Sequence, residues 1–211
     1  MRARQAAVEE TRLRITEATM SLHESIGPRA TTVSAIAEQA AVTRLTVYRH
    51  FPDEESHVSA CSAHWSQLHP RPDPESWVKI DDPVKRLRTA LSETYAWARP
   101  AAPMMSKIFR DLDAMPDFVS QFLAADERAR VAVLGRGFRA RGQAVRRVDA
   151  ALAHALRLST RESLCSHGGL TDSAAINIMV GTVLAAQSTR VPQRFLDNIE
   201  NPTYPRGLRS V

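Results

Sequence analysis

Cysteine is scarce in this chain. Only Cys61 and Cys165 occur among 211 residues, and their spacing suits neither a zinc site nor a set of disulfides. Few cysteines are typical of a protein that works in a reducing compartment, so we expect a cytoplasmic location. We therefore expect no metal site and no bound cofactor.

Patterns for strands and membrane spans are also missing. Aromatic residues make up 6% of the chain, and no run alternates β-branched or aromatic residues with polar ones as a half-buried strand would. The longest apolar stretch, residues 174–186, contains Asn177 and falls short of the roughly 20 residues that cross a bilayer. Residues 1–15 lack the apolar core of a signal peptide. An all-α protein with no membrane partner is expected.

Signatures of catalysis are absent as well. The sequence has no nucleophile elbow, no glycine-rich phosphate loop and no histidines at metal-binding spacing. Asp111 and Asp113 are two positions apart on a predicted helix, so their carboxylates do not face each other. We therefore do not expect an enzyme, and a buried cluster of titratable groups in the second half would revive that alternative.

What the chain does contain is a series of amphipathic helices separated by prolines, glycines and helix caps. These signals predict about nine helices, over residues 7–26, 33–40, 44–50, 54–68, 83–99, 104–115, 117–137, 145–165 and 171–187. Pro100 and Pro103 are expected to separate two of them. The segment His69–Glu75 has three alternating prolines and is predicted to be a stiff linker. It divides the chain into domains of residues 1–68 and 69–211, the second ending in an irregular tail.

The net charge of +5 is compatible with a nucleic-acid partner. Residues 1–51 carry seven arginines and five glutamates, whereas residues 128–161 carry nine arginines and one aspartate. We interpret the second, stronger patch as a solvated helical face, because it lies far from the best DNA-reading pattern.

That pattern lies between Thr31 and Phe51. Two short helices joined by so tight a turn must cross steeply, which requires a small residue where they meet, a compact turn and apolar wedges. These roles fall to Ala37, to Ala41, and to Ile36, Val42 and Val47. The second helix then exposes a polar face with two arginines and no acid, which fits the major groove. An ordinary helical hairpin in a core is the alternative, and this polar face argues against it.

Neighbouring positions add to the pattern. The matching residues are Ile15, Ala18, Gly27, Thr31, Thr32, Val33, Ile36, Ala37, Ala40, Val42, Thr43, Tyr48, His50, Phe51, Pro52 and Asp53. As a set, over about residues 12–58, they resemble the tetracycline-repressor family of transcriptional regulators. The rest of the chain is similar to that family only in length and helical pattern.

The resemblance implies that the first three helices and the start of the fourth form a DNA-binding head. The residues implied to contact DNA are Thr32, Thr43, Arg44, Thr46, Tyr48, Arg49 and His50. Tyr48 and His50 would contact phosphates, and Thr32 would bind phosphate at a helix N-terminus. Arg44 and Thr46 would meet base edges.

Two departures from the family pattern bear on DNA affinity. Ala41 stands where glycine is usual, and a positive φ there would cost about 1 kcal/mol. Glu54 stands where a lysine usually begins the fourth helix, so no phosphate contact is carried over. Either affinity is lower than usual in the family, or Arg2, Arg4 or Arg12 compensates.

The last two long helices carry apolar stripes that predict a dimer interface. Its expected residues are Val148, Leu152, Ala155, Ile176, Val180, Val183 and Leu184. The resemblance implies that two such helices from each subunit form a four-helix interface. The alternative is that both helices belong to the core of one chain.

A pocket for an unknown small-molecule effector is expected between residues 83 and 165, lined by methionine and aromatic side chains. The candidates are Tyr95, Trp97, Met104, Met105, Phe109, Phe122 and His154. The resulting hypothesis is a homodimeric repressor that holds an inverted-repeat site in duplex DNA until the effector binds. The alternative is an effector-free dimeric DNA-binding protein whose C-terminal domain only dimerises or recruits a protein; a closed core in this region would favour it.

Overall fold

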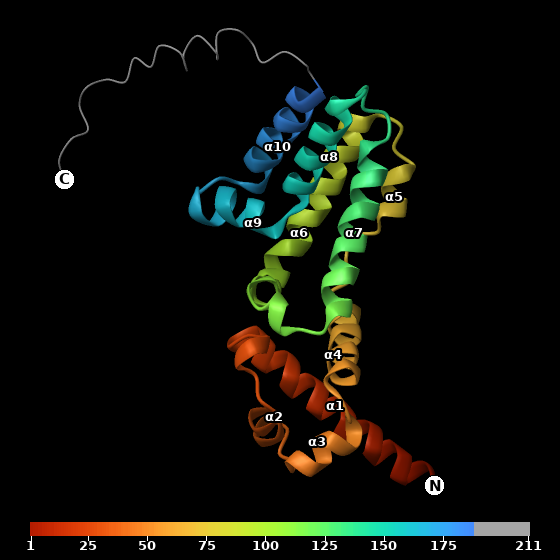
Figure 1. Cartoon of the computed structure of the whole chain (residues 1–211), viewed down its shortest axis with the longest axis vertical. Helices are drawn as coiled ribbons and strands as arrows, with labels where there is room; N and C mark the ends of the chain where they lie inside the picture. The colour runs from red at the N-terminus through yellow and green to blue at the C-terminus, as the bar shows by residue number, and fades with distance from the viewer. Residues whose placement is uncertain (188–211) are drawn as a thin grey trace, which may run out of the picture.

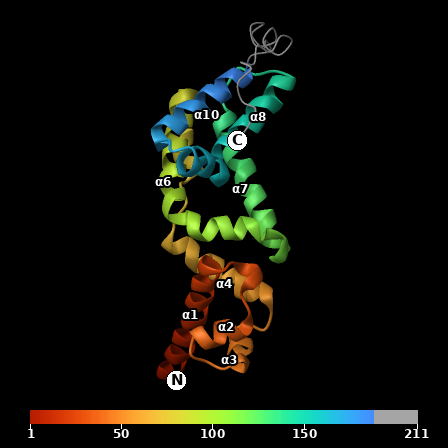
Figure 2. The ribbon, with the colours of Figure 1, turned by 90° about the vertical axis from the view of Figure 1, so that its left-hand side faces the viewer.

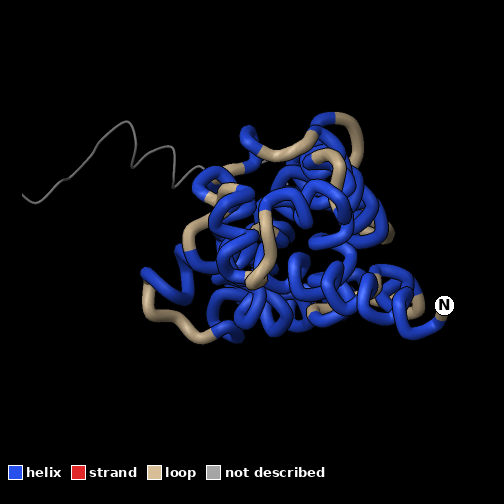
Figure 3. The backbone as a smooth tube through the Cα atoms, turned by 90° about the horizontal axis from the view of Figure 1, so that it is seen from below, coloured by secondary structure: helices blue, strands red, loops and turns tan. Residues whose placement is uncertain are grey.

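The computed structural model describes residues 1–187, and in that range the protein is entirely helical (Figures 1 and 3). The helices are α1 (Arg2–Ser25), α2 (Val33–Gln39), α3 (Arg44–His50), α4 (Glu54–Leu68), α5 (Pro74–Val78), α6 (Pro83–Arg110), α7 (Asp117–Gly135), α8 (Gln143–Leu156), α9 (Leu158–Arg161) and α10 (Asp172–Gln187). The prediction of an all-α fold is confirmed. The expected irregular tail, residues 190–211, lies outside the described range. None of the described helices has the length and apolarity needed to cross a bilayer.

The first three helices form a small head around their own apolar core. Its buried residues are Ile15, Ala18, Ile36, Ala37, Ala40, Val47 and Phe51. Threonine caps fix where α2 and α3 begin: the Thr32 hydroxyl accepts the Ala35 N–H, and that of Thr43 accepts the Thr46 N–H, each at 3.1 Å. Local signals of this kind are readable in sequence, and the predicted starts of both helices agree with the structure.

Helices α6, α7, α8 and α10 pack around a second, larger core at the other end of the molecule (Figure 1). Its fully buried side chains include Leu91, Leu134 and Leu152. Helix α4 leads from the head towards this bundle, and its Trp65 packs in a third cluster with Met104 of α6. Because α4 contributes to packing on both sides, the division at residues 68/69 stays a prediction.

Helix α6 corrects the expectation of two helices separated at Pro100 and Pro103. It continues through both prolines, but its ribbon turns sharply near the middle (Figure 2). Both prolines are exposed, while Ala101 and Met104 on the opposite face are buried. Burial of that face offsets the missing backbone hydrogen bonds, so the prolines bend the helix instead of ending it.

Two further boundaries differ from the expectation. The predicted helix 145–165 is three pieces, because extended backbone at Arg157 separates α8 from α9 and a π-helical turn, Glu162–His167, follows. The predicted linker runs into helix α5, which Asp73 caps by accepting the Glu75 N–H at 3.0 Å. This helix forms because Trp77 is fully buried in the larger core, where its indole N–H donates to Glu93.

A buried histidine at the top of the head gives a pH test of this packing. Burial, reinforced by the nearby His57, lowers the pKa of His23 to about 4 from the ordinary value of 6.5. As pH falls from 6.5 towards 4, the unfolded chain binds a proton at His23 and the folded chain does not. Stability is therefore lost across this window, by at most about 3 kcal/mol from this group.

We expect His23→Met to reduce the fall in thermal midpoint between pH 7 and pH 5, measured by circular dichroism. His154→Met, at an exposed site on α8, is the matched control and should leave the fall unchanged. Equal pH dependence in wild type and His23→Met would contradict the assignment.

Candidate nucleic-acid interface and ligand cavities

The seven residues expected to touch DNA all lie on α3 or at the caps of α2 and α3, at the end of the molecule remote from α10 (Figure 1). Thr32, Thr43, Arg44, Tyr48 and Arg49 are exposed, and Thr46 and His50 are half-buried. Val47, at 1% exposure, holds the opposite face of α3 in the head core. This arrangement leaves a short helix with a polar, cationic outer face. That these side chains contact DNA stays a prediction.

In the turn between α2 and α3, Ala41 has the positive φ that was expected at its position. Ala41 has φ of 52°, and it is the sole non-glycine residue with positive φ in residues 1–187. Its N–H donates to the Glu38 carbonyl at 3.1 Å, and the next N–H, of Val42, donates to the Ala37 carbonyl at 2.9 Å. These two bonds hold a conformation that costs an alanine about 1 kcal/mol.

Arg12 holds the C-terminal end of α3 against α1. Its guanidinium donates to the His50 carbonyl at 2.8 Å and lies 4.2 Å from the centre of the Phe51 ring. Phe51 in turn stacks on His57 of α4, with ring centres 4.4 Å apart. Arg12 therefore supports α3 from inside the head, and whether Arg2, Arg4 or Arg12 compensates on DNA stays a prediction.

A group of charged side chains joins the head to the end of α6, and we call it the Asp111 clamp. Arg110 donates to the Ile26 carbonyl at 2.9 Å, just where α1 ends. The Asp111 carboxylate accepts the backbone N–H of Arg29 at 3.2 Å and two bonds from Arg110 at 2.8 Å. Arg29 also pairs with Asp113. Asp111 is 3% exposed, and the bond from Arg110 holds its pKa at about 2.

Gly27 is the residue that lets the clamp close. Its φ of 93° is one that side chains rarely adopt, and a Cβ at this position would overlap Arg110 and Asp111. The role of Asp111 in joining the head to α6 was not predicted from the sequence. Asp111 binds Arg29, 82 residues away, and Arg110 binds Ile26, 84 residues away, so both bonds lie beyond the reach of any local pattern.

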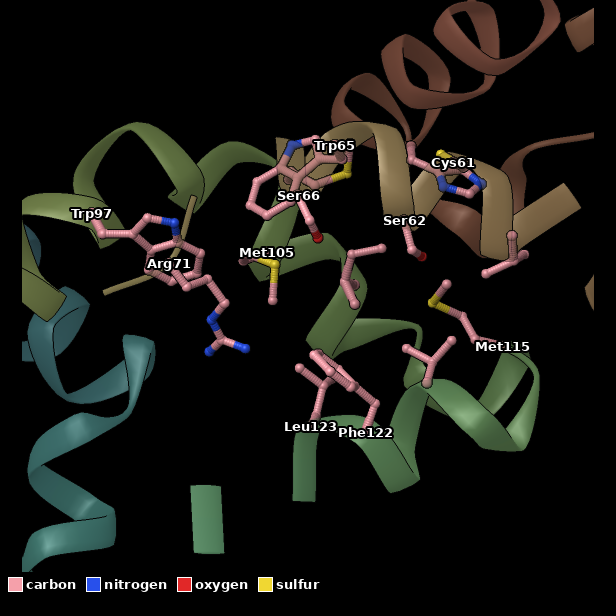
Figure 4. Close-up of a pocket in the computed structure, with 15 residues that line it drawn as sticks. Cys61, Ser62, Trp65, Ser66, Arg71, Trp97, Met105, Met115, Phe122 and Leu123 are labelled. Atoms are coloured by element: carbon pink, nitrogen blue, oxygen red, sulfur yellow. The ribbon is translucent and has the colours of Figure 1, made fainter. Parts of the chain in front are cut away.

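Two adjoining cavities lie above the head. The small cavity, of about 90 Å³, is bounded by α4, α6 and α7 and by His23 of α1 (Figure 4). The large cavity, of about 650 Å³, lies between α6, α7 and α9. Both are lined by Arg71, Trp97, Met105 and Leu123. A molecule in the large cavity can therefore extend an apolar part toward the small one.

Six of the seven predicted ligand residues line these cavities. Trp97 and Met105 line both, Met104 and Phe122 line the small cavity, and Tyr95 and Phe109 line the large one. His154 lines neither and is exposed on α8. The polar lining, which includes Arg71, Thr94 and Arg161, was not predicted, because only methionine and aromatic residues were taken as signals of a pocket. Ligand binding by any of these residues stays a prediction.

Most of the expected dimer residues are buried in the core of the single chain. Val148, Leu152, Ala155, Ile176, Val180 and Val183 are buried within the single chain, with exposures of 0–8%. Leu184, at 41%, is exposed, together with Val145 and Ile178 on the same two helices. Helix α10 is apolar on more than one side, so periodicity alone does not say which side faces the chain's own core, and the predicted interface residues stay a prediction. Dimer formation itself stays a prediction.

No group of three or more histidine, cysteine or acidic side chains comes together in a metal-binding arrangement within the described part of the chain. Cys61 is buried at the small cavity, and burial raises the pKa of its thiol to about 12. The thiol is therefore protonated at neutral pH and a poor nucleophile.

Residues 15–56 match the family model described as bacterial regulatory proteins, tetR family. This segment covers α2, α3 and the turn between them, with the C-terminal part of α1 and the start of α4. No curated protein matches the chain significantly.

Solved structures resemble the chain over most of its length. A TetR-like transcriptional regulator from Rhodococcus sp. RHA1 has a TM-score of 0.61 at 13% identity, over 85% of this chain and 97% of that one. A candidate fatty acid metabolism regulator from Clostridium perfringens has a TM-score of 0.57 at 16% identity, over 84% of this chain and 100% of that one. A second transcriptional regulator from the same Rhodococcus has a TM-score of 0.58 at 21% identity, over 86% of this chain and 99% of that one. At identities this low, the TM-scores establish a shared fold.

The exposed face of α3 generates a prediction on base reading. Arg44→Ala should weaken binding to the specific site by about 1–3 kcal/mol and relax base choice at one position per half-site, because arginine can make two bonds to a guanine edge. Competition binding with specific and scrambled duplexes measures both effects. Arg128→Ala, an exposed arginine on α7, is the control. Unchanged affinity and preference in Arg44→Ala would show that α3 lies differently on DNA.

Proposed function

We propose that the chain is a tetR-family DNA-binding regulator of transcription, and not an enzyme, and that it is a repressor released from DNA by a small molecule. In this proposal a cytoplasmic homodimer places two copies of α3 in successive major grooves of an inverted repeat. A ligand that enters the large cavity stabilises a conformation with a different spacing of the two copies, and the operator is released.

The observation that carries the proposal is the position of Arg110. Its side chain lines the large cavity and also donates to the Ile26 carbonyl at the end of α1. A ligand that displaces the end of α6 would therefore displace the head through the Asp111 clamp. The Arg110 side chain and the Asp111 carboxylate would thus couple the large cavity to the head.

The effector-free alternative is less well supported. It was to be favoured by a closed core between residues 83 and 165, whereas a cavity of about 650 Å³ lies there. A cavity of that size falls in the range of small-molecule sites.

Dimerisation is proposed to use the outer faces of α8 and α10. Val145, Ile178 and Leu184 are large apolar side chains with exposures of 41–45%. Clustered exposed apolar residues are typical of surfaces that a partner covers. Val180 is a poor probe of this surface, since at 2% exposure an arginine there would unfold the subunit before it affected a partner.

The first test is to sequence the DNA fragments that the purified protein retains. We expect an inverted repeat whose half-sites are centred about 34–36 Å apart or a multiple of this. Ile178→Arg should give a monomer by light scattering and lose the tight binding, because each half-site alone holds weakly. Ala132→Arg, at an exposed site on α7, should stay dimeric. A retained pool with no common sequence, or a monomeric wild type, would contradict the proposal.

The second test concerns the clamp. Asp111→Asn keeps the side-chain size and removes the charge that holds Arg110 and the Arg29 N–H. We expect about fivefold weaker operator binding, within the usual range of coupling between sites, with unchanged base preference. Asp113→Asn is the control, because Asp113 is largely exposed and touches only Arg29 of the clamp. Wild-type affinity in Asp111→Asn would show that the clamp does not set the spacing of the reading helices.

A further inference from the structure

Two of the residues that line the large cavity each carry a buried polar atom without a hydrogen-bond partner. These atoms are the Thr94 hydroxyl oxygen on α6 and the Nε of Arg161 on α9, and no other buried side-chain nitrogen or oxygen in residues 1–187 lacks a partner. Each residue is 8% exposed. Unpaired buried donors are rare and destabilising, so two of them around one cavity indicate a missing hydrogen-bond acceptor.

The charge around these atoms favours an anion. The cavity is lined by five arginines (Arg71, Arg110, Arg130, Arg157 and Arg161) and by three acids (Asp126, Glu127 and Glu162). Two of the three acids are paired with arginines, and the third, Glu162, has a serine as its partner. Asp126 pairs with Arg71 and Arg130, Glu127 pairs with Arg157, and Glu162 accepts the Ser106 hydroxyl.

Arg161 keeps part of its positive charge uncompensated. Its Nη2 pairs with Asp172 at 3.0 Å, but that carboxylate also accepts a bond from Arg99 at 2.5 Å. One carboxylate therefore serves two guanidinium groups. The Nε–H of Arg161 remains a charge-assisted donor with nothing to donate to.

The remaining lining shows what the other part of the ligand must be. Trp97, Met105 and Leu123 line both cavities, so an apolar body can lie along them toward the small cavity. In the small cavity, Trp65, Met105 and Phe122 project into the space that its apolar lining surrounds (Figure 4). Thr94 and Arg161 line the large cavity alone, whereas Trp65 and Phe122 line the small cavity alone.

We infer that the large cavity binds an amphipathic organic acid. Its carboxylate accepts the Arg161 Nε–H and the Thr94 hydroxyl, and its apolar body lies on Trp97 and Met105. The inference rests on the proposed function in one respect: this acid would be the effector whose binding moves the end of α6.

The experiment uses matched probes, because the natural ligand is unidentified. Two series share an apolar body and differ in the head group: straight-chain acids from hexanoate to dodecanoate with the corresponding alcohols and amines, and 2-naphthoate with 2-naphthalenemethanol. Titration calorimetry on the full chain without DNA measures affinity. We expect at least one acid to bind, its alcohol to bind about tenfold more weakly, and its amine not to bind.

Two variants test the donors individually. Thr94→Val and Arg161→Lys should each weaken the acid about tenfold and leave the alcohol unchanged, because the lysine keeps a charge for Asp172 but lacks Nε–H. Thr89→Val, the same change on α6 outside the cavity lining, should alter neither affinity. Since the Thr94 hydroxyl is unpaired in the free protein, Thr94→Val should also keep or raise the thermal midpoint, which separates loss of a donor from loss of folding.

The result that overturns the inference is equal binding of acid and alcohol, or no binding in either series, or unchanged acid binding in both Thr94→Val and Arg161→Lys. Its failure is distinguishable from failure of the proposed function. A protein that binds an inverted repeat and ignores every acid refutes the ligand class alone. A protein that binds the acid through Thr94 and Arg161 but keeps its operator affinity refutes release by this ligand and leaves the site itself supported.

Discussion

The carboxylate of Asp111 joins the two ends of this molecule. It is buried, it stays ionised because Arg110 donates to it, and it accepts a backbone N–H from the first residues after α1. Without it, Arg110 would be one more exposed arginine beside a cavity, and the head would be held to the bundle mainly by α4 and by apolar packing of α1. The clamp makes the end of α6 a shared element of both sites. This is why the position of the cavity matters for a surface at the other end of the protein.

The head was largely predictable from sequence because its determinants are local. Threonine caps act over three residues, the tight turn needs a small residue at Ala41, and the apolar spacing of α2 and α3 defines the buried face. Each signal is contained within one or two helical turns, so neighbouring residues suffice to read it. Arg12 is the exception: its partner is the carbonyl of His50, 38 residues away, and nothing in its own surroundings indicates that bond.

The bundle was less predictable because distant packing decides it. Pro100 would end an isolated helix, yet α6 continues because Ala101 and Met104 are buried on its other face. The apolar stripe of α10 can be recognised in the sequence, but whether its cover is the same chain or a second one depends on where α6 and α8 lie. The partners of Arg161 lie outside any pattern in its own segment, and so does the absence of a partner for its Nε.

Gly27 links this architecture to genetics. Every missense change at its codon adds a Cβ, and there the Cβ meets Arg110 and Asp111 while the backbone needs a positive φ. Such alleles would leave the sequence of α3 and the apolar lining of both cavities unchanged, and would displace Arg110 and Asp111 at the joint between head and bundle. In the proposed function, codon 27 is thus a site where a single nucleotide change would alter the coupling between the ligand cavity and the DNA-binding head.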